Sequence, residues 1–280
     1  KEAGEYFQKY ISLLEELRRV ATGWPDIPVL DYDARGQIPR INLSVKLSSL
    51  YSQLDPLDVA GSEKGLLPRL EQLFDRAVEA NAFINVDMED YRLKDLTLRI
   101  FKSVAGAPKY RAYRHLGIVL QVYLKETEQD LSELADWARR RGTPVTVRLV
   151  KGAYWDYETI HAQQHGWPIP VYSHKWETDA AFERCSRRLL AAYPHLEAAF
   201  GSHNIRSIAA ALAHAETLQI PKNAFEMQGL YGMADPLKET LAEDGYRVRV
   251  YAPFGELLPG MAYLVRRLLE NTANESFLRQ

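Results

Sequence analysis

The chain alternates short runs of β-branched and apolar residues with longer amphipathic runs. Residues 5–20 carry apolar side chains at helical spacing with Glu and Arg between them, which predicts an amphipathic helix that must pack against a larger body. Seven later runs are typical of strands, at residues 40–47, 82–89, 117–124, 145–152, 197–204, 224–232 and 246–253.

Helical patterns lie between these strands, at residues 66–81, 130–142, 179–193 and 205–218. The repeated strand and helix order predicts an α/β fold with a parallel sheet and crossover helices. Seven strands are one short of a (β/α)8 barrel, so the eighth lies upstream of residue 1 or among unrecognised segments, and a seven-stranded open sheet is the alternative. No low-complexity linker divides the chain. We expect a lead-in helical segment at 1–40 and a barrel domain at 41–280.

Composition excludes some classes of protein. The 280 residues hold 35 Lys and Arg against 37 Asp and Glu, so no large basic field would draw the chain onto nucleic acid. No apolar run approaches the roughly 20 residues that span a bilayer. The single cysteine, Cys185, cannot form an internal disulfide, which favours a reducing compartment such as the cytoplasm. We interpret it as a half-buried helix residue rather than a nucleophile.

Each predicted strand carries a polar or ionisable residue near its carboxyl end. In a parallel barrel these ends meet at one mouth, where active sites are found. A single such residue would indicate only a local hydrogen bond, but a repeated pattern favours a site. The residues are Lys46, Asp87, Gln121, Arg148, His203, Gln228 and Tyr251.

Two segments carry further candidate chemistry. Arg148 is followed at its strand exit by Lys151, Gly152 and Ala153, whose backbone could approach a planar or phosphorylated ligand; an ordinary strand-loop junction explains the pattern equally well. Trp155 could lie against an aromatic ring, although packing is the simpler role. His203 has no second His or Cys at ligand spacing, so we expect no metal site, and no dinucleotide or P-loop fingerprint is present.

A C-terminal stretch places charged residues in an apolar helix pattern. Tyr263, Arg266, Arg267 and Glu270 stand at i, i+3, i+4 and i+7 and share one helix face. They form either a solvated stripe on an outer helix or, because the stretch follows the last strand, a pair of guanidinium groups directed at a substrate carboxylate.

Together these motifs resemble the proline dehydrogenase family. The resemblance rests on "VKLSSLY", "NVDMEDY", "RLVKGAYWD", "GSHN", "LYGMADP", "VRVYAPFGELLPGMAYLVRRLLEN" and "NESF", which span residues 41–277. Both the stand-alone enzyme and the flavin domain of the bifunctional proline-utilisation protein are similar, and the closing stretch is more similar to the bifunctional form.

The resemblance implies a distorted (β/α)8 barrel with non-covalent FAD at its mouth and a first strand upstream of residue 1. The implied reaction is oxidation of L-proline to Δ1-pyrroline-5-carboxylate by hydride transfer to flavin N5, with electrons passed to a membrane quinone. Such an enzyme would be soluble or peripheral at the inner membrane face. The bifunctional form would also join it to an aldehyde dehydrogenase module, which these residues do not contain.

The resemblance also implies residue roles. Arg266, Arg267 and Lys46 would bind the proline carboxylate. Tyr251, Tyr263 and Leu230 would surround its ring. Asp87 would support the basic cluster by pairing, and Arg148 would lie near the reactive part of the flavin. The flavin contacts would be Met88, Gln121, Arg148, Lys151, Gly152, Ala153, Trp155, Ser202, His203 and Glu270.

Two other functions remain open. A Schiff-base aldolase on the same barrel would use Lys46 or Lys151 as its nucleophile and would be colourless. A carboxylate-binding module without flavin would bind proline analogues without turnover.

Overall fold

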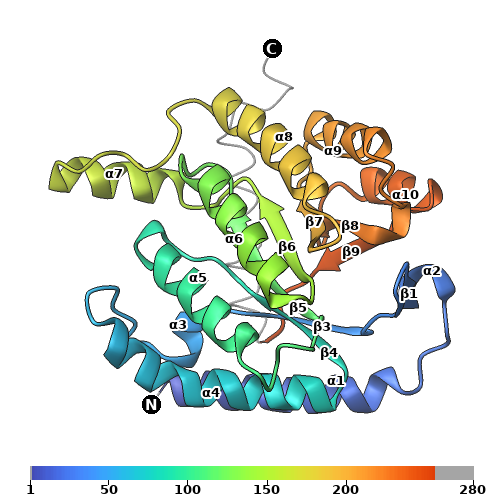
Figure 1. The fold of residues 1–280 in the computed structure, drawn as a ribbon, viewed down its shortest axis with the longest axis horizontal. Coiled ribbons are helices and arrows are strands. Elements are labelled where there is room, and N and C mark those ends of the chain that lie inside the picture. The colour runs from blue at the N-terminus through green and yellow to red at the C-terminus, as the bar shows by residue number, and fades with distance from the viewer. Residues whose placement is uncertain (1, 256–280) are drawn as a thin grey trace.

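A curled parallel sheet forms the centre of the computed structural model, which describes residues 2–255 (Figure 1). Its strands follow chain order, so each is hydrogen-bonded to the next. Each lies within or overlaps one of the seven runs predicted from the sequence. They are β3 (Ile41–Val45), β4 (Ala82–Val86), β5 (Leu116–Gln121), β6 (Val145–Val150), β7 (Leu196–Gly201), β8 (Phe225–Leu230) and β9 (Val248–Tyr251).

Crossover helices connect the strands and cover the outer face of the sheet, with α5, α6 and α8 nearest the viewer in Figure 1. Strand β5, which has neighbours on both sides, is buried along its whole length, as expected for a strand between a helical layer and a filled interior. The connecting helices are α4 (Val59–Glu79), α5 (Tyr91–Gly106), α6 (Thr127–Arg141), α7 (Trp155–His165), α8 (Lys175–Ala191), α9 (Ile205–Thr217) and α10 (Asp235–Glu243), and a 3-10 turn, η1 (Lys222–Ala224), precedes β8.

The consecutive strand order and the curl of the sheet are those of a distorted (β/α)8 barrel, so the predicted fold class is confirmed. Within residues 2–255 the first and last strands of the sheet, β3 and β9, are not hydrogen-bonded to each other. Side chains connect the two sides across the interior instead: Tyr251 Oη donates to Asp87 Oδ2 over 3.3 Å.

The predicted N-terminal helix is α1 (Glu2–Ala21), and it packs on β3, α4 and the short helix α3 (Leu47–Leu50). Its buried face includes Phe7, Ile11 and Leu14. In Figure 1, α1 runs beside α4. The sequence did not predict the next elements, a turn of helix α2 (Pro28–Asp31) and the two-stranded hairpin β1 (Tyr32–Asp33) and β2 (Gly36–Gln37). The lead-in segment therefore contributes to the same hydrophobic core as the barrel.

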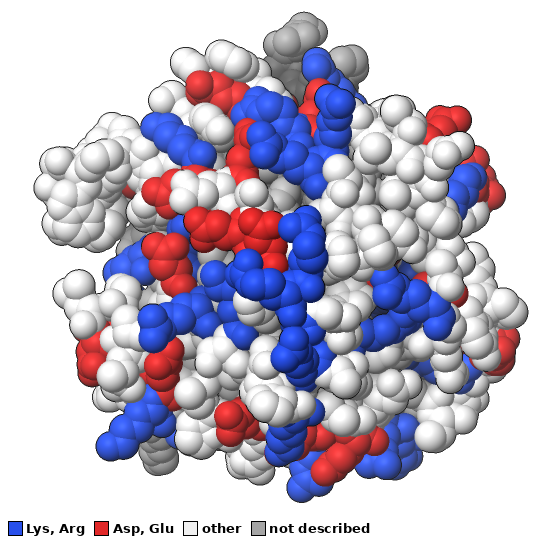
Figure 2. Space-filling view, viewed as in Figure 1, with Lys and Arg blue, Asp and Glu red and all other residues white. Residues whose placement is uncertain are grey.

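Charges of both signs cover the helical face in Figure 2. Basic side chains on α8 lie beside acidic ones on α6: Arg184 and Arg188 both pair with Glu128, at 2.7 and 3.2 Å. These surface pairs are partly exposed and contribute little to stability individually. Among residues 2–255, no helix combines the length and apolar character needed to cross a bilayer.

Candidate active site

A cavity of about 440 Å³ lies at the carboxyl ends of the parallel strands. This volume is in the range of small-molecule and cofactor sites. The structure brings to this cavity every strand-exit residue singled out from the sequence: Lys46, Asp87, Gln121, Arg148, His203, Gln228 and Tyr251. The exits meet because all seven strands run parallel around a curled sheet.

The most strongly held pair in the cavity is Asp87 and Arg148. Arg148 Nη1 donates to Asp87 Oδ1 over 2.8 Å, and the two side chains are only 8% and 13% exposed. The second guanidinium nitrogen, Nη2, donates to Ser44 Oγ over 2.9 Å. The guanidinium carbon also lies 5.3 Å from the centre of the Tyr251 ring. Arg148 is thus fixed by partners on three other strands, β3, β9 and the exit of β4.

Asp87 accepts further hydrogen bonds. Besides Arg148, Asn85 Nδ2 donates to its Oδ1 over 3.2 Å and Tyr251 Oη to its Oδ2 over 3.3 Å. Its backbone N–H donates to Val45 O over 2.9 Å, which places the exits of β3 and β4 side by side. The sequence did not single out Asn85 or Ser44. In the sequence, Asn85 and Ser44 could have been recognised as polar residues at inward-facing positions of mostly apolar strands.

Lys46 lies directly before α3, and a residue of α1 lies close to this junction. Ser49 Oγ donates to Lys46 O over 2.6 Å, and Tyr10 Oη lies 3.2 Å from the same Ser49 oxygen. Burial raises the pKa of Tyr10, so its hydroxyl stays neutral at physiological pH. Among the described residues, no carboxylate lies within ion-pair distance of Lys46 Nζ. Because Lys46 also lines the cavity, it is a candidate anion-binding residue.

The loop after β6 lines another wall with Lys151, Gly152 and Ala153. Gly152 has a φ of +123°, and a Cβ at this position would overlap the ring of Tyr123. Only glycine suits both conditions. Lys151 O accepts from Tyr123 N over 2.7 Å, and Lys151 Nζ forms an ion pair with Asp179. Burial lowers the pKa of Lys151, although Asp179 opposes the shift.

The other described residues predicted to bind a ligand divide into two groups. Met88, Ser202, His203 and Leu230 line the cavity. Trp155 does not line it; the residue is 41% exposed and its Nε1 donates to Tyr172 O over 2.7 Å. The role of Trp155 toward a flavin stays a prediction. Four further predicted residues, Tyr263, Arg266, Arg267 and Glu270, lie outside the described residues.

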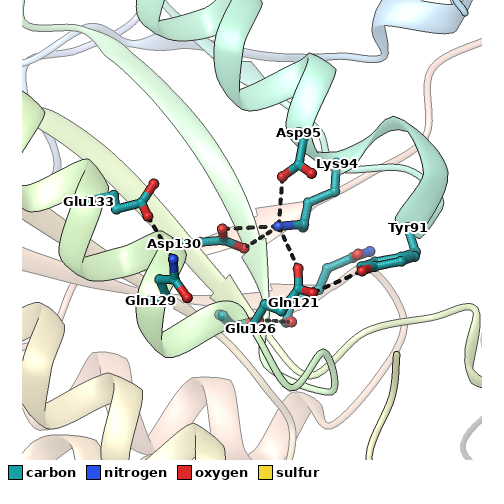
Figure 3. Close-up of polar contacts among 9 residues, drawn as sticks. Tyr91, Lys94, Asp95, Gln121, Glu126, Gln129, Asp130 and Glu133 are labelled. Carbon is teal, nitrogen blue, oxygen red and sulfur yellow. Dashed lines mark hydrogen bonds and ion pairs between the residues drawn. The ribbon is translucent and has the colours of Figure 1, made fainter. Parts of the chain in front are cut away.

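A charged cluster lies beside the exit of β5 and joins α5 to α6 (Figure 3). Lys94 is 4% exposed, and its Nζ lies 2.9 Å from Asp130, 2.8 Å from Asp95 and 3.1 Å from Glu126. Burial disfavours the ammonium charge, but the bonds to Asp95 and Asp130 outweigh it and raise the pKa of Lys94. Next to this cluster, Thr127 Oγ1 donates to Gln121 O over 2.6 Å. The start of α6 is thereby tied to a cavity residue.

The other histidine residues and the cysteine are candidate metal ligands, and the cysteine is also a candidate nucleophile. The sequence analysis missed a His161 and His165 pair one turn apart on α7, with ring centres 4.4 Å apart. Residues 2–255 contain no group of three His, Cys, Asp or Glu side chains placed to hold a metal ion. Cys185 is fully buried rather than half-buried, and burial raises its pKa to about 12, so the thiol is protonated at neutral pH.

The comparison with known families decides the assignment. The family model described as proline dehydrogenase matches residues 1–280. The chain belongs to the proline dehydrogenase family. The resemblance drawn from the sequence motifs is therefore confirmed.

Relatives within the proline dehydrogenase family are of two lengths. The bifunctional protein PutA of Escherichia coli K12 is 34% identical over 255 residues, which are 89% of this chain and 19% of PutA. The proline dehydrogenase of Deinococcus radiodurans is 34% identical over 242 residues, 85% of this chain and 68% of that protein. The chain thus spans about a fifth of the length of its curated PutA relatives.

Solved structures of the family agree with the fold. The crystal structure of proline utilization A from Bdellovibrio bacteriovorus, inactivated by N-propargylglycine, matches with a TM-score of 0.97 and 50% sequence identity. The match covers 100% of this chain and 29% of that one. A Bradyrhizobium japonicum PutA matches with a TM-score of 0.86 and 34% identity, over 99% of this chain and 27% of that one.

Proposed function

We propose that the protein oxidises L-proline to Δ1-pyrroline-5-carboxylate with FAD as its cofactor, the first step of proline catabolism. The observation that carries the proposal is the cavity at the strand exits, where Lys46, Asp87 and Arg148 meet in a chain that matches the proline dehydrogenase family throughout. The names of the relatives, proline dehydrogenase and proline utilization A, support the same substrate.

The residues of the cavity fit a flavin. Gln121 Oε1 and Arg148 Nε are buried without a hydrogen-bond partner among the described residues, and both side chains line the cavity. Buried polar atoms in that state favour a ligand that satisfies them. Gly152 also lines the cavity, and the space that a side chain would need at this position is taken by the Tyr123 ring. The residues that would hold FAD are Met88, Gln121, Arg148, Lys151, Gly152, Ala153, Ser202 and His203.

When bound, FAD would supply the two-electron acceptor that takes a hydride from the carbon beside the proline nitrogen. The protein's own residues would bind the substrate and orient it. Lys46 would attract the substrate carboxylate, joined by Arg266 and Arg267 as the family resemblance implies. Leu230 and Tyr251 line the cavity, where they would pack on the pyrrolidine ring and exclude water.

Arg148 would provide a fixed positive charge next to the flavin, and Asp87 neutralises that charge before the reaction. Its ion pair with Asp87 compensates the charge at rest, and the Tyr251 hydroxyl and Asn85 amide hold that carboxylate in place. A preorganised cation of this kind stabilises negative charge that develops on a reduced cofactor. Because the pair is buried, it needs no reorganisation of water when the charge appears.

The electron acceptor and location follow from the same proposal. Electrons would leave to a quinone, and the protein would then work in the cytoplasm, in peripheral contact with the inner face of the membrane. The PutA relatives are bifunctional proteins, which supports fusion to a second module. The family resemblance implies that this module is an aldehyde dehydrogenase that consumes the product.

The test is the visible absorption spectrum of the purified full-length protein, recorded anaerobically before and after addition of L-proline. We expect a flavin spectrum that bleaches with L-proline and does not bleach with L-alanine, which carries the same carboxylate without the ring. A protein that stays colourless after FAD is supplied would refute the cofactor. A flavin that L-proline leaves oxidised would refute the substrate.

One observation supports a second candidate, the Schiff-base aldolase. Lys151 lines the cavity and burial lowers its pKa, which favours a nucleophilic amine. Its ion pair with Asp179 occupies that amine, and this favours the flavin site. Borohydride treatment with a carbonyl substrate distinguishes the two, because the aldolase would acquire a covalent adduct on Lys151. A flavin-less binding module would bind a proline analogue without colour or turnover.

A further inference from the structure

Leu230 lies at the end of β8, beyond the part of β8 that pairs with β7. Side chains, rather than a neighbouring strand, bind its backbone N–H and C=O on that side. Pairing between β7 and β8 ends at Gly201 and Gln228, so β8 continues past its neighbour on that side. Leu230 N donates to His203 Nε2 over 2.9 Å, and Leu230 O accepts from Lys238 Nζ over 3.0 Å. The N–H and C=O of one strand residue point to the same side. The two side chains therefore occupy the place of the absent strand.

Lys238 reaches this position from α10. Its side chain is 13% exposed, and its stem lies over Gly229, where an added Cβ would stand 2.9 Å from Lys238 Cδ. Asp235 orients the ammonium group through a 2.6 Å ion pair. The remaining donor near Leu230 O is the backbone N–H of Met233, at 3.4 Å, which is a weaker hydrogen bond. Lys238 is thus the principal hydrogen-bond donor to this carbonyl among the described residues.

Leu230 lines the cavity and Lys238 does not. We propose that Lys238 is a positioning residue for the substrate pocket: from outside the cavity it holds the Leu230 carbonyl and so sets where the Leu230 side chain meets the substrate ring. This inference rests on the proposed function, in which Leu230 packs on the pyrrolidine ring of L-proline. No contact of Lys238 with substrate or flavin is required.

The expected kinetic consequence is specific. Loss of the Lys238 donor leaves the Leu230 carbonyl with the weaker Met233 contact, and the exit of β8 can then shift relative to the cavity. Packing of Leu230 on the ring stabilises bound proline and the transition state alike, so its loss raises KM and leaves kcat nearly unchanged. Most proposed flavin contacts lie on β5, β6 and the loop after β6 and keep their geometry. Among the described residues, His203, which accepts from Leu230 N, is the one proposed flavin contact joined to the β8 exit.

The test replaces Lys238 in the full-length protein with methionine, which keeps most of the stem and removes the donor. For Lys238→Met we expect a rise of about tenfold in the KM for L-proline, the size expected when one apolar side chain loses part of its packing on the substrate ring. We expect kcat and the equilibrium binding of FAD to the apoprotein to stay within about twofold of wild type, a margin well below that tenfold change. Lys238→Arg keeps a donor and should recover most of the affinity.

The matched control is Lys222→Met. Lys222 Nζ also donates to a backbone carbonyl, Asp244 O, over 2.8 Å, but Lys222 is exposed and does not line the cavity. This variant should leave KM unchanged. A KM in Lys238→Met no higher than in Lys222→Met would overturn the proposal, and so would a parallel loss of FAD binding, which indicates general disruption.

Amide hydrogen exchange of residues 225–234 separates this inference from the proposed function. In Lys238→Met, but not in Lys222→Met, exchange of this segment should become faster because the strand exit is less firmly held. If wild-type protein were not reduced by L-proline, the proposed function would fail; faster exchange would then still support Lys238 as the residue that holds the strand exit. Unchanged exchange would refute that role whatever the substrate.

Discussion

Asp87 and Arg148 can lie inside an otherwise apolar barrel because each compensates the charge of the other. A buried ion pair stabilises little by itself, and removing one partner leaves an uncompensated charge. The sequence predicted that both residues lie at strand exits. It did not predict that they pair with each other or with Ser44, because contacts across the interior depend on the curl of the sheet rather than on local pattern.

Another residue at the opposite end of the strands makes stability depend on pH. Burial, aided by the charge of Arg114, lowers the pKa of His115 from 6.5 to about 4. In the unfolded chain this ring binds a proton near pH 6.5, whereas the folded protein resists protonation until about pH 4. Its contribution to stability is therefore complete above pH 6.5 and is lost as the pH falls toward 4.

We expect His115→Phe to reduce the loss of stability between pH 7 and pH 5 by about 1 kcal/mol, after allowance for the partly exposed ring. The measurement is urea unfolding of both proteins at the two pH values. His203, whose pKa burial also lowers, remains in both proteins and cancels from the comparison. Equal pH dependence in the two proteins would show that His115 ionises normally in the folded state.

At the scale of elements, the Lys94 cluster joins α5 to α6 behind the exit of β5 (Figure 3). For Lys94→Met we expect a loss of about 3 kcal/mol in the free energy of unfolding, because Asp130 is left buried without its cation. Asp95→Asn is the control. That carboxylate is 86% exposed, so its replacement should cost less than about 1 kcal/mol. Chemical denaturation measures both, and similar losses would contradict a buried pair.

Most helices with a regular apolar face were predictable, but α5 was missed although it buries such a face, with Leu93, Ile100 and Val104 among its buried residues. The patterns at 130–142 and 205–218 correspond to α6 and α9, which bury one stripe each. The sequence did not predict α7 or α10, because α7 buries only Glu158 and Ala162 and α10 only Leu241. Without a buried stripe there is no helical period to detect. Lys238 was missed for the same reason, since its role depends on where α10 lies.

For the whole molecule, the strand runs and the family motifs were sufficient to predict a parallel barrel with a site at its mouth. They did not predict the polar layer at the opposite end of the strands. There Arg249 forms a two-point ion pair with Glu226, at 2.8 and 2.9 Å, and joins β9 to β8. Burial disfavours the carboxylate charge, but Arg249 outweighs it and the pKa of Glu226 is lowered. The ion pair keeps both charges buried near the amino ends of the strands, opposite the cavity.

This pairing predicts that two substitutions are less harmful than one. Arg249→Met should cost about 3 kcal/mol or more in the free energy of unfolding, because the Glu226 carboxylate remains buried without its cation. Adding Glu226→Gln to that variant removes the charge while keeping the side-chain shape, so the double variant should be more stable than Arg249→Met alone. Urea denaturation of the wild type, both single variants and the double variant gives the coupling energy directly. Additive losses would mean that water solvates the two charges independently. The amino-terminal end of the barrel would then be open to water rather than closed around an ion pair.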